Sequence, residues 1–215
     1  MSLTFYYSPM STAVITHLVL EELRVPCEMI KVDLKQGETR RPEFLRLNPN
    51  GKVPLVVHDG TPIWESAAIT MYLGETFGVE KKVYPAPGPK RGEAMKWIVW
   101  TNVTLFEAVG RFSRNTQNWV PEEQRNAKAG EAAKADIANC LRIVDEALAG
   151  PDGAADKGKQ FLVGEFTLAD LHLDSLLGWV RHLGIDFAPY ARLNAWSQRC
   201  SQRPAYQRVM AAEAG

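Results

Sequence analysis

The sequence has few cysteines, and they are not arranged for metal binding or redox exchange. Only three occur in 215 residues, Cys27, Cys140 and Cys200, and no two of them form a CxxC motif. An odd number of widely separated cysteines argues against a disulfide framework and against a zinc site. We therefore expect the three thiols to be reduced and structural.

An excess of charge and a long hydrophobic run are also missing. Lys and Arg together number 25, as do Asp and Glu, so no net field attracts nucleic acid or an anionic membrane. No apolar run approaches the roughly 20 residues that cross a bilayer, and the N-terminus shows no signal-peptide pattern. We expect a cytoplasmic protein whose partners include neither nucleic acid nor a membrane.

Several motifs of common enzyme classes do not occur. The four histidines, His17, His58, His172 and His182, show no metal-ligand spacing. We find no Ser-His-Asp order, no glycine-rich phosphate loop and no dinucleotide-binding fingerprint. Hydrolase, nucleotide-binding and dehydrogenase functions are therefore disfavoured, and no bound metal is expected.

The first 79 residues alternate strand and helix patterns. Asp59-Gly60 is a strong two-residue hairpin turn, so the strands on either side of it should be antiparallel. A βαβ unit, a short helix and a ββα unit together predict a mixed α/β fold with four strands. The expected elements are strands 3–7, 29–32, 53–58 and 61–64 and helices 11–23, 42–47 and 65–78.

The rest of the chain has a different character. Residues 80–92 are rich in Pro, Gly and Lys, which is typical of a linker. In FTLADL, Thr167 fits a helix N-cap with Asp170 at the third helical position, which predicts a structural capping box. Residues 93–215 show no convincing strand, and we expect helices over 93–113, 122–149, 167–183 and 190–202, with a polar loop at 150–158.

The first candidate for chemistry is YYSPMS, residues 6–11, where the first strand should meet the first helix. Ser8 and Ser11 flank Pro9 at positions where a redox loop would carry cysteines. A hydroxyl at a helix N-terminus can stabilise a ligand thiolate, because that environment lowers thiol pKa values. The alternative is that Ser11 only caps the helix.

Two further motifs suit an extended zwitterionic ligand. In NPNGKVP, a cis Val53–Pro54 bond would turn the Val53 backbone toward such a ligand, although most X-Pro bonds are trans, and Lys52 can bind a carboxylate. In WES, Ser66 and the helix N-terminus can hold a second carboxylate while Glu65 pairs with an ammonium group. The alternatives are a solvated surface lysine and an ordinary helix cap.

Taken jointly, these motifs resemble those of a cytosolic glutathione S-transferase. The chain carries, in that family's order and spacing, Y-S-P-M-S, N-P-N-G-K-V-P, W-E-S-A-A-I, the Pro-rich linker and F-T-L-A-D-L. The resemblance implies a thioredoxin-like N-terminal domain over residues 1–79, an all-α helical-bundle C-terminal domain over residues 93–215, and a homodimer. It is closest to bacterial types that use a serine or a tyrosine rather than a cysteine.

The resemblance also implies a reaction and the residues that bind its co-substrate, glutathione, with no permanently bound cofactor. Val53, before a Pro54 expected to be cis, would pair its backbone with the cysteinyl part of glutathione. Lys52 would lie near the glycyl carboxylate, and Glu65 and Ser66 would hold the γ-glutamyl end. Such enzymes lower the thiol pKa of glutathione and hold the thiolate beside a small hydrophobic electrophile.

The side chain that meets the sulfur stays open among several hydroxyls. Ser11 is the first choice because it follows the proline by two residues, as in some serine-using classes. Ser8 matches classes with a serine immediately before the proline, and Tyr7 matches the tyrosine classes. Thr12 falls near the cysteine of one bacterial class, which puts a covalent cysteine mechanism in doubt.

The electrophile site and the exact activity are less closely specified. By resemblance, the candidate residues for the electrophile site are Phe106, Arg111, Phe112 and Asn115, most of which can equally be core. One rival function is a glutathione- or ligand-binding protein without useful catalysis. Another is a glutathione-dependent reductase or peroxidase, although the absence of cysteine from residues 6–12 counts against thiol-disulfide exchange.

Overall fold

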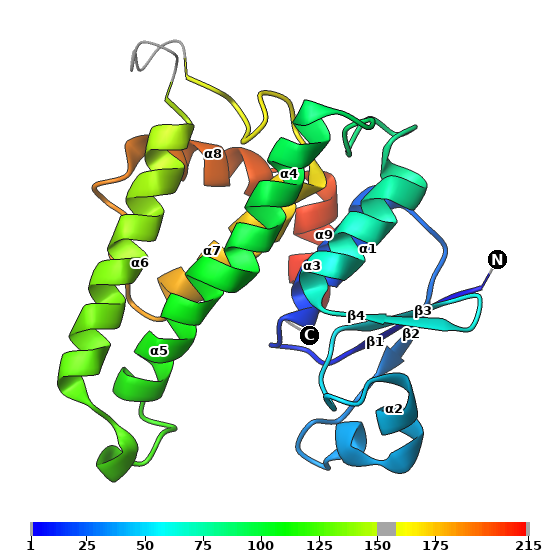
Figure 1. The fold of residues 1–215 in the computed structure, drawn as a ribbon, viewed down its shortest axis with the longest axis horizontal. Coiled ribbons are helices and arrows are strands. Elements are labelled where there is room, and N and C mark those ends of the chain that lie inside the picture. The colour runs from blue at the N-terminus through cyan, green and yellow to red at the C-terminus, as the bar shows by residue number, and fades with distance from the viewer. Residues whose placement is uncertain (1, 150–157, 214–215) are drawn as a thin grey trace. The chain divides into compact units, whose positions relative to one another are not determined.

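A mixed four-stranded sheet forms the centre of the first part of the chain (Figure 1). The computed structural model describes residues 2–149 and 158–213. The sheet consists of strands β1 (Leu3–Tyr7), β2 (Glu28–Lys31), β3 (Leu55–His58) and β4 (Thr61–Trp64). Their order is β2-β1-β3-β4; β1 is parallel to β2 and antiparallel to β3, and β3 is antiparallel to β4. This confirms the predicted α/β, thioredoxin-like sheet.

Alternate residues of β1 face opposite sides of this sheet. The Phe5 ring lies 6.2 Å from that of His17 on helix α1 (Ala13–Leu23), whereas Tyr6 packs edge-on against Phe44 of helix α2 (Pro42–Leu47). Because side chains alternate along a strand, α1 and α2 cover opposite faces. Helix α3 (Ser66–Leu73) contacts α1 and therefore shares its face.

Most expected elements are present, with small shifts at their ends. Helix α1 begins at Ala13 rather than at residue 11. Strand β3 begins at Leu55 rather than at residue 53, since Pro54 has no N–H to donate to the sheet. The Asp59-Gly60 hairpin is as predicted, with φ of +46° and +81° at its two central residues.

The helix expected over residues 65–78 changes its winding partway. It is α-helical as far as Leu73 and continues as one π-helical turn, η2 (Gly74–Gly78). The aromatic ring of Tyr84 lies directly against this turn. A Cβ added to Gly74 would come within 2.5 Å of the ring. Glycine at this position therefore lets a later segment approach the helix backbone closely.

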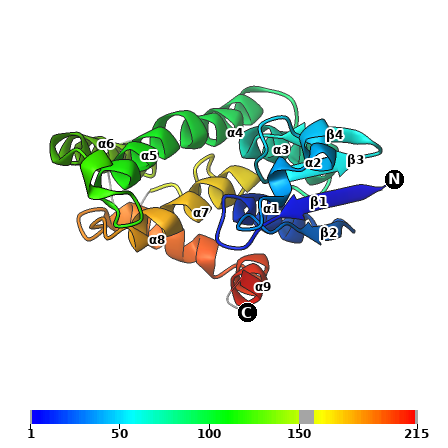
Figure 2. The ribbon, with the colours of Figure 1, turned by 90° about the horizontal axis from the view of Figure 1, so that it is seen from below.

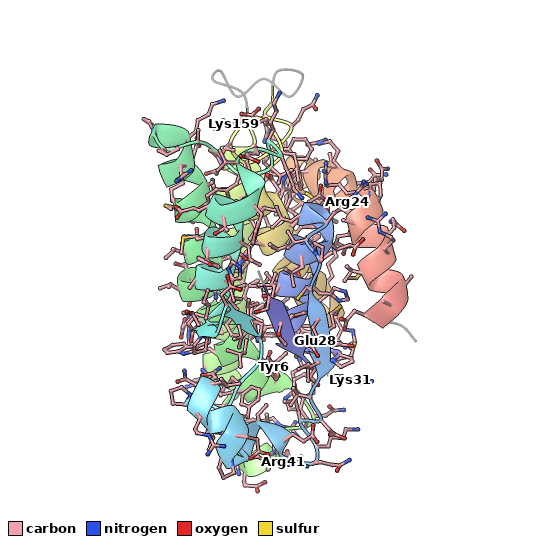
Figure 3. The ribbon with its side chains drawn as sticks, turned by 90° about the vertical axis from the view of Figure 1, so that its right-hand side faces the viewer. Tyr6, Arg24, Glu28, Lys31, Arg41 and Lys159 are labelled. Carbon is pink, nitrogen blue, oxygen red and sulfur yellow. The ribbon has the colours of Figure 1, made fainter. Side chains whose placement is uncertain are left out.

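Contacts divide the chain into two compact units. The first runs to Arg91 and also includes the described residues from Ser201 onward, and the second runs from Gly92 to Cys200. Helix α9 (Pro204–Glu213) belongs to the first unit because it packs along α1 (Figure 3). The expected domain over residues 93–215 grouped this last helix with the other helices, since its local pattern carries no sign of what it packs against.

The second unit is helical in the part that the structure describes, apart from one isolated bridge between Val163 and Glu165. Helix α4 (Pro89–Trp100) continues through a π-helical turn, η3 (Thr101–Leu105), into α5 (Phe106–Thr116), so that the three form one rod (Figure 2). Helix α5 packs against α6 (Ala127–Ala147). Helices α7 (Leu168–His182) and α8 (Ala191–Ser201) follow.

Three differences from the expected helices are local. Helix α4 begins inside the expected linker of residues 80–92, with Pro89 at its start, where the missing N–H of proline costs nothing. The helix expected from residue 122 begins at Ala127, after the short 3₁₀ turn η4 (Glu122–Gln124). The polar loop expected at 150–158 lies almost wholly outside the described residues.

The capping box at the start of α7 is confirmed. The Asp170 carboxylate accepts the backbone N–H of Thr167 at 2.8 Å, that of Leu162 at 2.9 Å and the Trp196 Nε1–H at 2.8 Å. Burial raises the pKa of Asp170, while these hydrogen bonds act in the opposite direction. The residue thus stabilises the turn before α7 and links it to α8.

Within the described residues, no helix has the length and hydropathy to cross a bilayer.

Candidate functional site

The junction between β1 and α1 is a tight turn held by the Ser11 hydroxyl. Ser11 Oγ donates to the Ser8 carbonyl oxygen at 2.7 Å and accepts the Ala13 backbone N–H at 3.2 Å. Met10, in the middle of the turn, has a φ of +55°. Ser11 therefore does cap the first turn of α1, as the simpler interpretation predicts.

Two of the three predicted hydroxyls, those of Ser11 and Tyr7, differ in what they already bind. A serine hydroxyl has a single proton to donate, and Ser11 gives that proton to Ser8. Ser11 can donate to a ligand thiolate only by exchanging this bond for the new one. Among the described residues, the Tyr7 hydroxyl makes no hydrogen bond; its ring stacks on Phe5 and lies 6.1 Å from the His17 ring. Which of these hydroxyls meets the sulfur stays a prediction.

A second loop, Asn48 to Pro54, lies against this junction. The Val53–Pro54 peptide is cis, which confirms that expectation. The buried side chain of Asn48 shapes the loop, since Nδ2 donates to the Lys52 carbonyl oxygen at 2.7 Å and Oδ1 accepts the Asn50 backbone N–H at 3.0 Å. Thr12 Oγ1 donates to the Val53 carbonyl oxygen at 3.5 Å and so connects the two loops.

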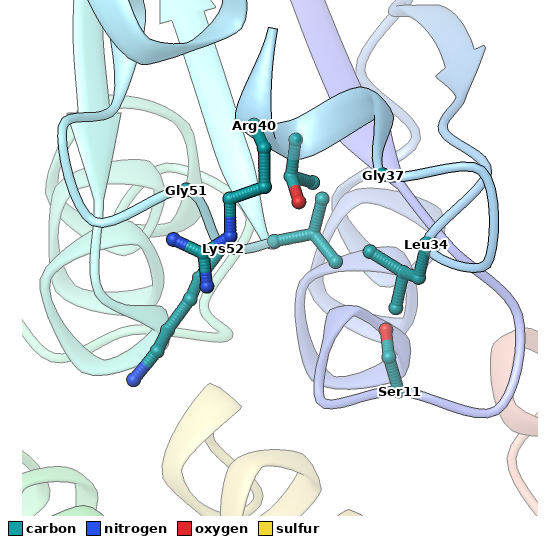
Figure 4. Close-up of a pocket in the computed structure, with 8 residues that line it drawn as sticks. Ser11, Leu34, Gly37, Arg40, Gly51 and Lys52 are labelled. Carbon is teal, nitrogen blue, oxygen red and sulfur yellow. The ribbon is translucent and has the colours of Figure 1, made fainter.

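These two loops and a third share one pocket of about 330 Å³ (Figure 4). Ser11 and Leu34 stand on one side of it, and Arg40 and Lys52 on the other. The structure thus brings together three predicted residues from two separate motifs, Ser11 from the first and Lys52 and Val53 from the second. The lining consists of Ser11, Leu34, Gly37, Thr39, Arg40, Gly51, Lys52 and Val53.

The third loop follows β2 and is folded around Asp33. This carboxylate accepts the backbone N–H groups of Lys35 at 2.8 Å and of Gln36 at 3.1 Å. The hydrogen bond from the Gln36 backbone is the main reason that the pKa of Asp33 lies below its usual value. The turn places Leu34 and Gly37 in the pocket wall.

Arg40 is the charged residue of the pocket that the sequence motifs did not indicate. Its Nη1 donates to the Asn50 carbonyl oxygen at 3.3 Å, and a Cβ on Gly51 would lie 2.7 Å from the same nitrogen. Gly51, with a φ of +60°, therefore leaves room for the guanidinium. The neighbouring Arg41 instead pairs with Glu38 at 3.1 Å and does not line the pocket. The glycine was a usable signal, but the sequence does not say which arginine approaches it.

Glu65 and Ser66 lie outside the lining of this pocket but next to its cis-proline loop. The β-hairpin register places Leu55 opposite Trp64, so the residues just beyond this pair, Pro54 and Glu65, are neighbours across the strands. Ser66 is buried as the first residue of α3, and Glu65 is exposed with a φ of +71°. The first N–H groups of an α-helix have no acceptor within the helix, so a helix start is a place where an anionic group can bind.

The four electrophile-site candidates lie on α5 in the second unit. Arg111 pairs with Glu107 at 2.8 Å and with Asp136 at 2.6 Å. Phe112 is buried, and Asn115 bonds the Arg111 carbonyl oxygen at 2.7 Å. Phe106, by contrast, is 42% exposed. Three of the four candidates thus have clear structural contacts, and Phe106 presents free apolar surface.

Cysteine and histidine chemistry finds little support elsewhere in the molecule. All three cysteines are free, and burial raises the pKa of Cys27 and of Cys140 to about 11. Burial also lowers the pKa of His172 to about 3, so its ring is neutral beside Asn102 Oδ1 at 2.7 Å. Within the described residues, no three His, Cys, Asp or Glu side chains gather closely enough to hold a metal ion.

Comparisons with known proteins agree with this architecture. The family model described as glutathione S-transferase, N-terminal domain, matches residues 1–75, and the corresponding C-terminal domain model matches residues 111–204. The chain is 32% identical over 195 residues to glutathione S-transferase GstB of Escherichia coli K12, covering 90% of this chain and 89% of that protein. It is 26% identical over 201 residues to glutathione S-transferase D7 of Anopheles gambiae, covering 93% and 86%.

Solved structures give the same result over the full fold. A glutathione transferase of Methylococcus capsulatus aligns with a TM-score of 0.82 at 28% identity, covering 99% of this chain and 98% of that one. A sphingomonad glutathione S-transferase solved in complex with glutathione aligns with a TM-score of 0.81 at 27% identity, covering 98% of both chains. The fold, the order of the motifs and these relatives together show that the chain belongs to the glutathione S-transferase family.

Proposed function

We propose that the protein is a glutathione transferase that activates the thiol of glutathione and conjugates it to small hydrophobic electrophiles. The observation that carries this proposal is the pocket at the start of α1. It combines two cationic side chains, the backbone of Val53 and a serine hydroxyl at a helix N-terminus. Glutathione is an extended peptide with a thiol between two charged ends. The pocket offers groups complementary to its thiol, its cysteinyl backbone and one charged end, and the neighbouring start of α3 offers groups for the other end.

The glycyl carboxylate is the part that the pocket explains best. Arg40 and Lys52 stand on the same side of the pocket, away from Ser11 (Figure 4). A guanidinium can bind a carboxylate through two parallel hydrogen bonds, and a nearby ammonium adds charge. We therefore assign this end of glutathione to Arg40 and Lys52 together.

The other two parts of glutathione follow along the cis-proline loop. The Val53 backbone binds the cysteinyl part, and its carbonyl oxygen is now engaged only by a long 3.5 Å contact from Thr12 among the described residues. The γ-glutamyl carboxylate then binds at the start of α3, where Ser66 and the positive end of the helix dipole lie. Glu65 receives the ammonium group.

In this mechanism the protein stabilises the thiolate and forms no covalent bond to it. The thiol loses its proton to solvent, and Ser11 turns its hydroxyl from Ser8 toward the sulfur. The thiolate then attacks the electrophile, forming a carbon–sulfur bond and expelling a leaving group or adding to an activated double bond. A preorganised donor at the N-terminus of α1 supplies the stabilisation. Tyr7 and Ser8 are the alternative donors.

Three further properties belong to the same proposal. The protein works as a homodimer in the cytoplasm, and its conjugation reaction serves to detoxify reactive compounds. Phe106, with its exposed ring, is the candidate for contact with the apolar part of the electrophile. Arg111, Phe112 and Asn115 then support the helix that carries it, through the ion pairs and hydrogen bonds given above.

The binding part of the proposal is tested by comparing two adjacent arginines. Calorimetry should show glutathione binding to the unmodified protein and, for Arg40→Gln, an affinity at least about tenfold lower, since a hydrogen bond to a charged group contributes about 1.5–3 kcal/mol. The matched control is Arg41→Gln, which removes only an exposed ion pair and should change the affinity less than about twofold. Equal effects of both substitutions would show that the pocket does not hold the carboxylate.

A further inference from the structure

The last helix of the chain presents a stripe of three residues to α1. Ala205, Val209 and Glu213 recur every fourth residue of α9, and the first two are buried. Residues at this spacing lie on one face of a helix. Glu213 therefore continues the stripe by which α9 packs along α1 (Figure 3).

Two ion pairs hold α9 in this position. Arg203, just before the helix, forms a two-pronged pair with Glu22 of α1, with Nε 3.0 Å from Oε2. Arg208 Nε lies 2.5 Å from Glu21 Oε1. Both acidic partners lie near the C-terminal end of α1, so the opposite end of α9 is carried toward the start of α1, where the β1–α1 turn lies.

The Glu213 carboxylate makes two contacts at that end, one with each of its oxygens. Oε2 accepts the backbone N–H of Met10 at 3.2 Å, and Oε1 lies 3.4 Å from His17 Nδ1. The Glu213 side chain is only 12% exposed and that of His17 only 14%. This largely buried carboxylate thus joins the turn that follows β1 to the first turns of α1.

The contact with Met10 acts on the least favourable backbone conformation of the turn. A residue with a side chain rarely adopts a positive φ, and Met10 has a φ of +55°. Its side chain is 72% exposed, so packing of that side chain does little to stabilise the conformation. The stabilising contacts are the Ser11 to Ser8 hydrogen bond within the turn and the Glu213 hydrogen bond from outside.

The contact with His17 acts on the other side of the same junction. The His17 ring lies 6.1 Å from that of Tyr7 and 6.2 Å from that of Phe5. Glu213 therefore restrains the ring against which Tyr7 packs, as well as the backbone of the Ser8–Ser11 turn. Tyr7 and Ser11 carry the two kinds of hydroxyl that could donate a hydrogen bond to the thiolate. Glu213 is linked to Tyr7 through the His17 ring and to Ser11 through the neighbouring Met10.

We propose that Glu213 is a positioning residue for thiol activation, which it controls by holding the Ser8–Ser11 turn and the His17 ring in place. Helix α9 thereby contributes to the geometry of the glutathione site through Glu213. The effect on the thiol rests on the proposed function, whereas the effect on the turn does not. Two measurements separate these consequences.

The first measurement needs no glutathione. In Glu213→Ala, the Met10 amide should exchange its hydrogen with solvent about five- to tenfold faster than in the unmodified protein, the factor expected for losing one ordinary hydrogen bond. Arg208→Ala is the matched control: it removes an α1–α9 ion pair but touches neither Met10 nor His17, and should leave this rate unchanged. An unchanged Met10 rate in Glu213→Ala would overturn the proposal.

The second measurement follows the thiol of bound glutathione by its ultraviolet absorbance as pH is varied. Glu213→Ala should raise the apparent thiol pKa, and for the conjugation reaction it should lower kcat by a larger factor than it raises KM for glutathione. In Glu213→Gln the amide oxygen can still accept the Met10 N–H, so this variant should recover most of the thiol pKa shift and most of kcat. If the unmodified protein lowers the thiol pKa but Glu213→Ala lowers it equally, the positioning role is refuted. If the unmodified protein does not lower it, the proposed function fails, while the amide-exchange result still decides whether Glu213 holds the turn.

Discussion

The molecule uses the same residue chemistry at two helix starts, with different results. At the start of α7, Thr167 and Asp170 are buried, and the carboxylate accepts hydrogen bonds from Leu162, Thr167 and Trp196. At the start of α1, Ser11 caps the helix but also lines an open pocket. A closed cap has all its partners within the protein and serves stability, whereas an open cap can change partners and serve a ligand.

The two helix starts differ in whether their hydrogen-bonding side chain can exchange a partner within the protein for a ligand. Around Asp170, the N–H groups of Leu162, Thr167 and Trp196 all bind the same carboxylate, and these residues are buried. Around Ser11, the hydroxyl proton goes to a carbonyl oxygen of its own turn, and that bond can be exchanged. Glu213 then holds the turn from outside, so that the exchange need not disturb the backbone.

The largest expected effect comes from breaking the closed cap. Asp170→Ala should destabilise the protein by about 3 kcal/mol or more, since three N–H groups lose their acceptor and a buried donor left unpaired costs about 1–3 kcal/mol. Denaturant unfolding measures this. Asp186→Ala is the control, because Asp186 is exposed and, among the described residues, accepts only the Ala188 N–H in a local turn. This substitution should cost less than about 1 kcal/mol. Similar losses for both would mean that the closed cap carries no special stability.

A second effect of the same region is a dependence of stability on pH. Burial raises the pKa of Asp174, which accepts the Ser197 hydroxyl at 2.5 Å, to about 7. The folded state then binds a proton that the unfolded state, with a carboxyl pKa near 4, has already lost. The free energy of unfolding should therefore fall by about 3 kcal/mol as pH rises from about 4 to about 7.

The Asp174→Asn variant isolates that contribution. Its free energy of unfolding should change less over this range than that of the unmodified protein, because the variant has no proton to lose at this position. Parallel curves for the two proteins would place the dependence on other groups.

The smallest expected effect on stability comes from the open cap. Ser11→Ala removes one hydroxyl that bridges Ser8 and Ala13, and loss of a helix cap typically costs about 1 kcal/mol. Thermal unfolding should therefore show only a modest decrease in Tm. A loss as large as that of Asp170→Ala would make Ser11 primarily structural, and the two helix starts would then not differ in role.

The sequence was sufficient where a feature is set by neighbouring residues. The hairpin at Asp59-Gly60 and the capping box at Thr167 depend on residues within a few positions, and both are present as predicted. The four-stranded sheet could also be predicted, since alternating apolar residues specify strands and the connections between them limit the topology. The cis peptide before Pro54 was implied by resemblance rather than by its local sequence.

The sequence was insufficient where a feature depends on distant contacts. Arg40 and Arg41 are indistinguishable in the sequence, and only the approach of Gly51 decides which of them lines the pocket. The contact of Glu213 with Met10 joins residues near opposite ends of the chain, and no local pattern indicates it. The start of α4 at Pro89 was missed because the Pro- and Gly-rich composition around it is also that of a linker.

The central claim is that the open helix start of α1 serves a ligand thiol. Its most direct test is the titration of the glutathione thiol bound to the unmodified protein, compared with Ser11→Ala, Ser8→Ala and Tyr7→Phe. We expect a bound thiol pKa clearly below that of free glutathione, and a return toward the free value in Ser11→Ala. A bound thiol that titrates as it does in free solution would show that this helix start does not serve the thiol, and a shift that survives Ser11→Ala but disappears in another variant would transfer the role to that residue.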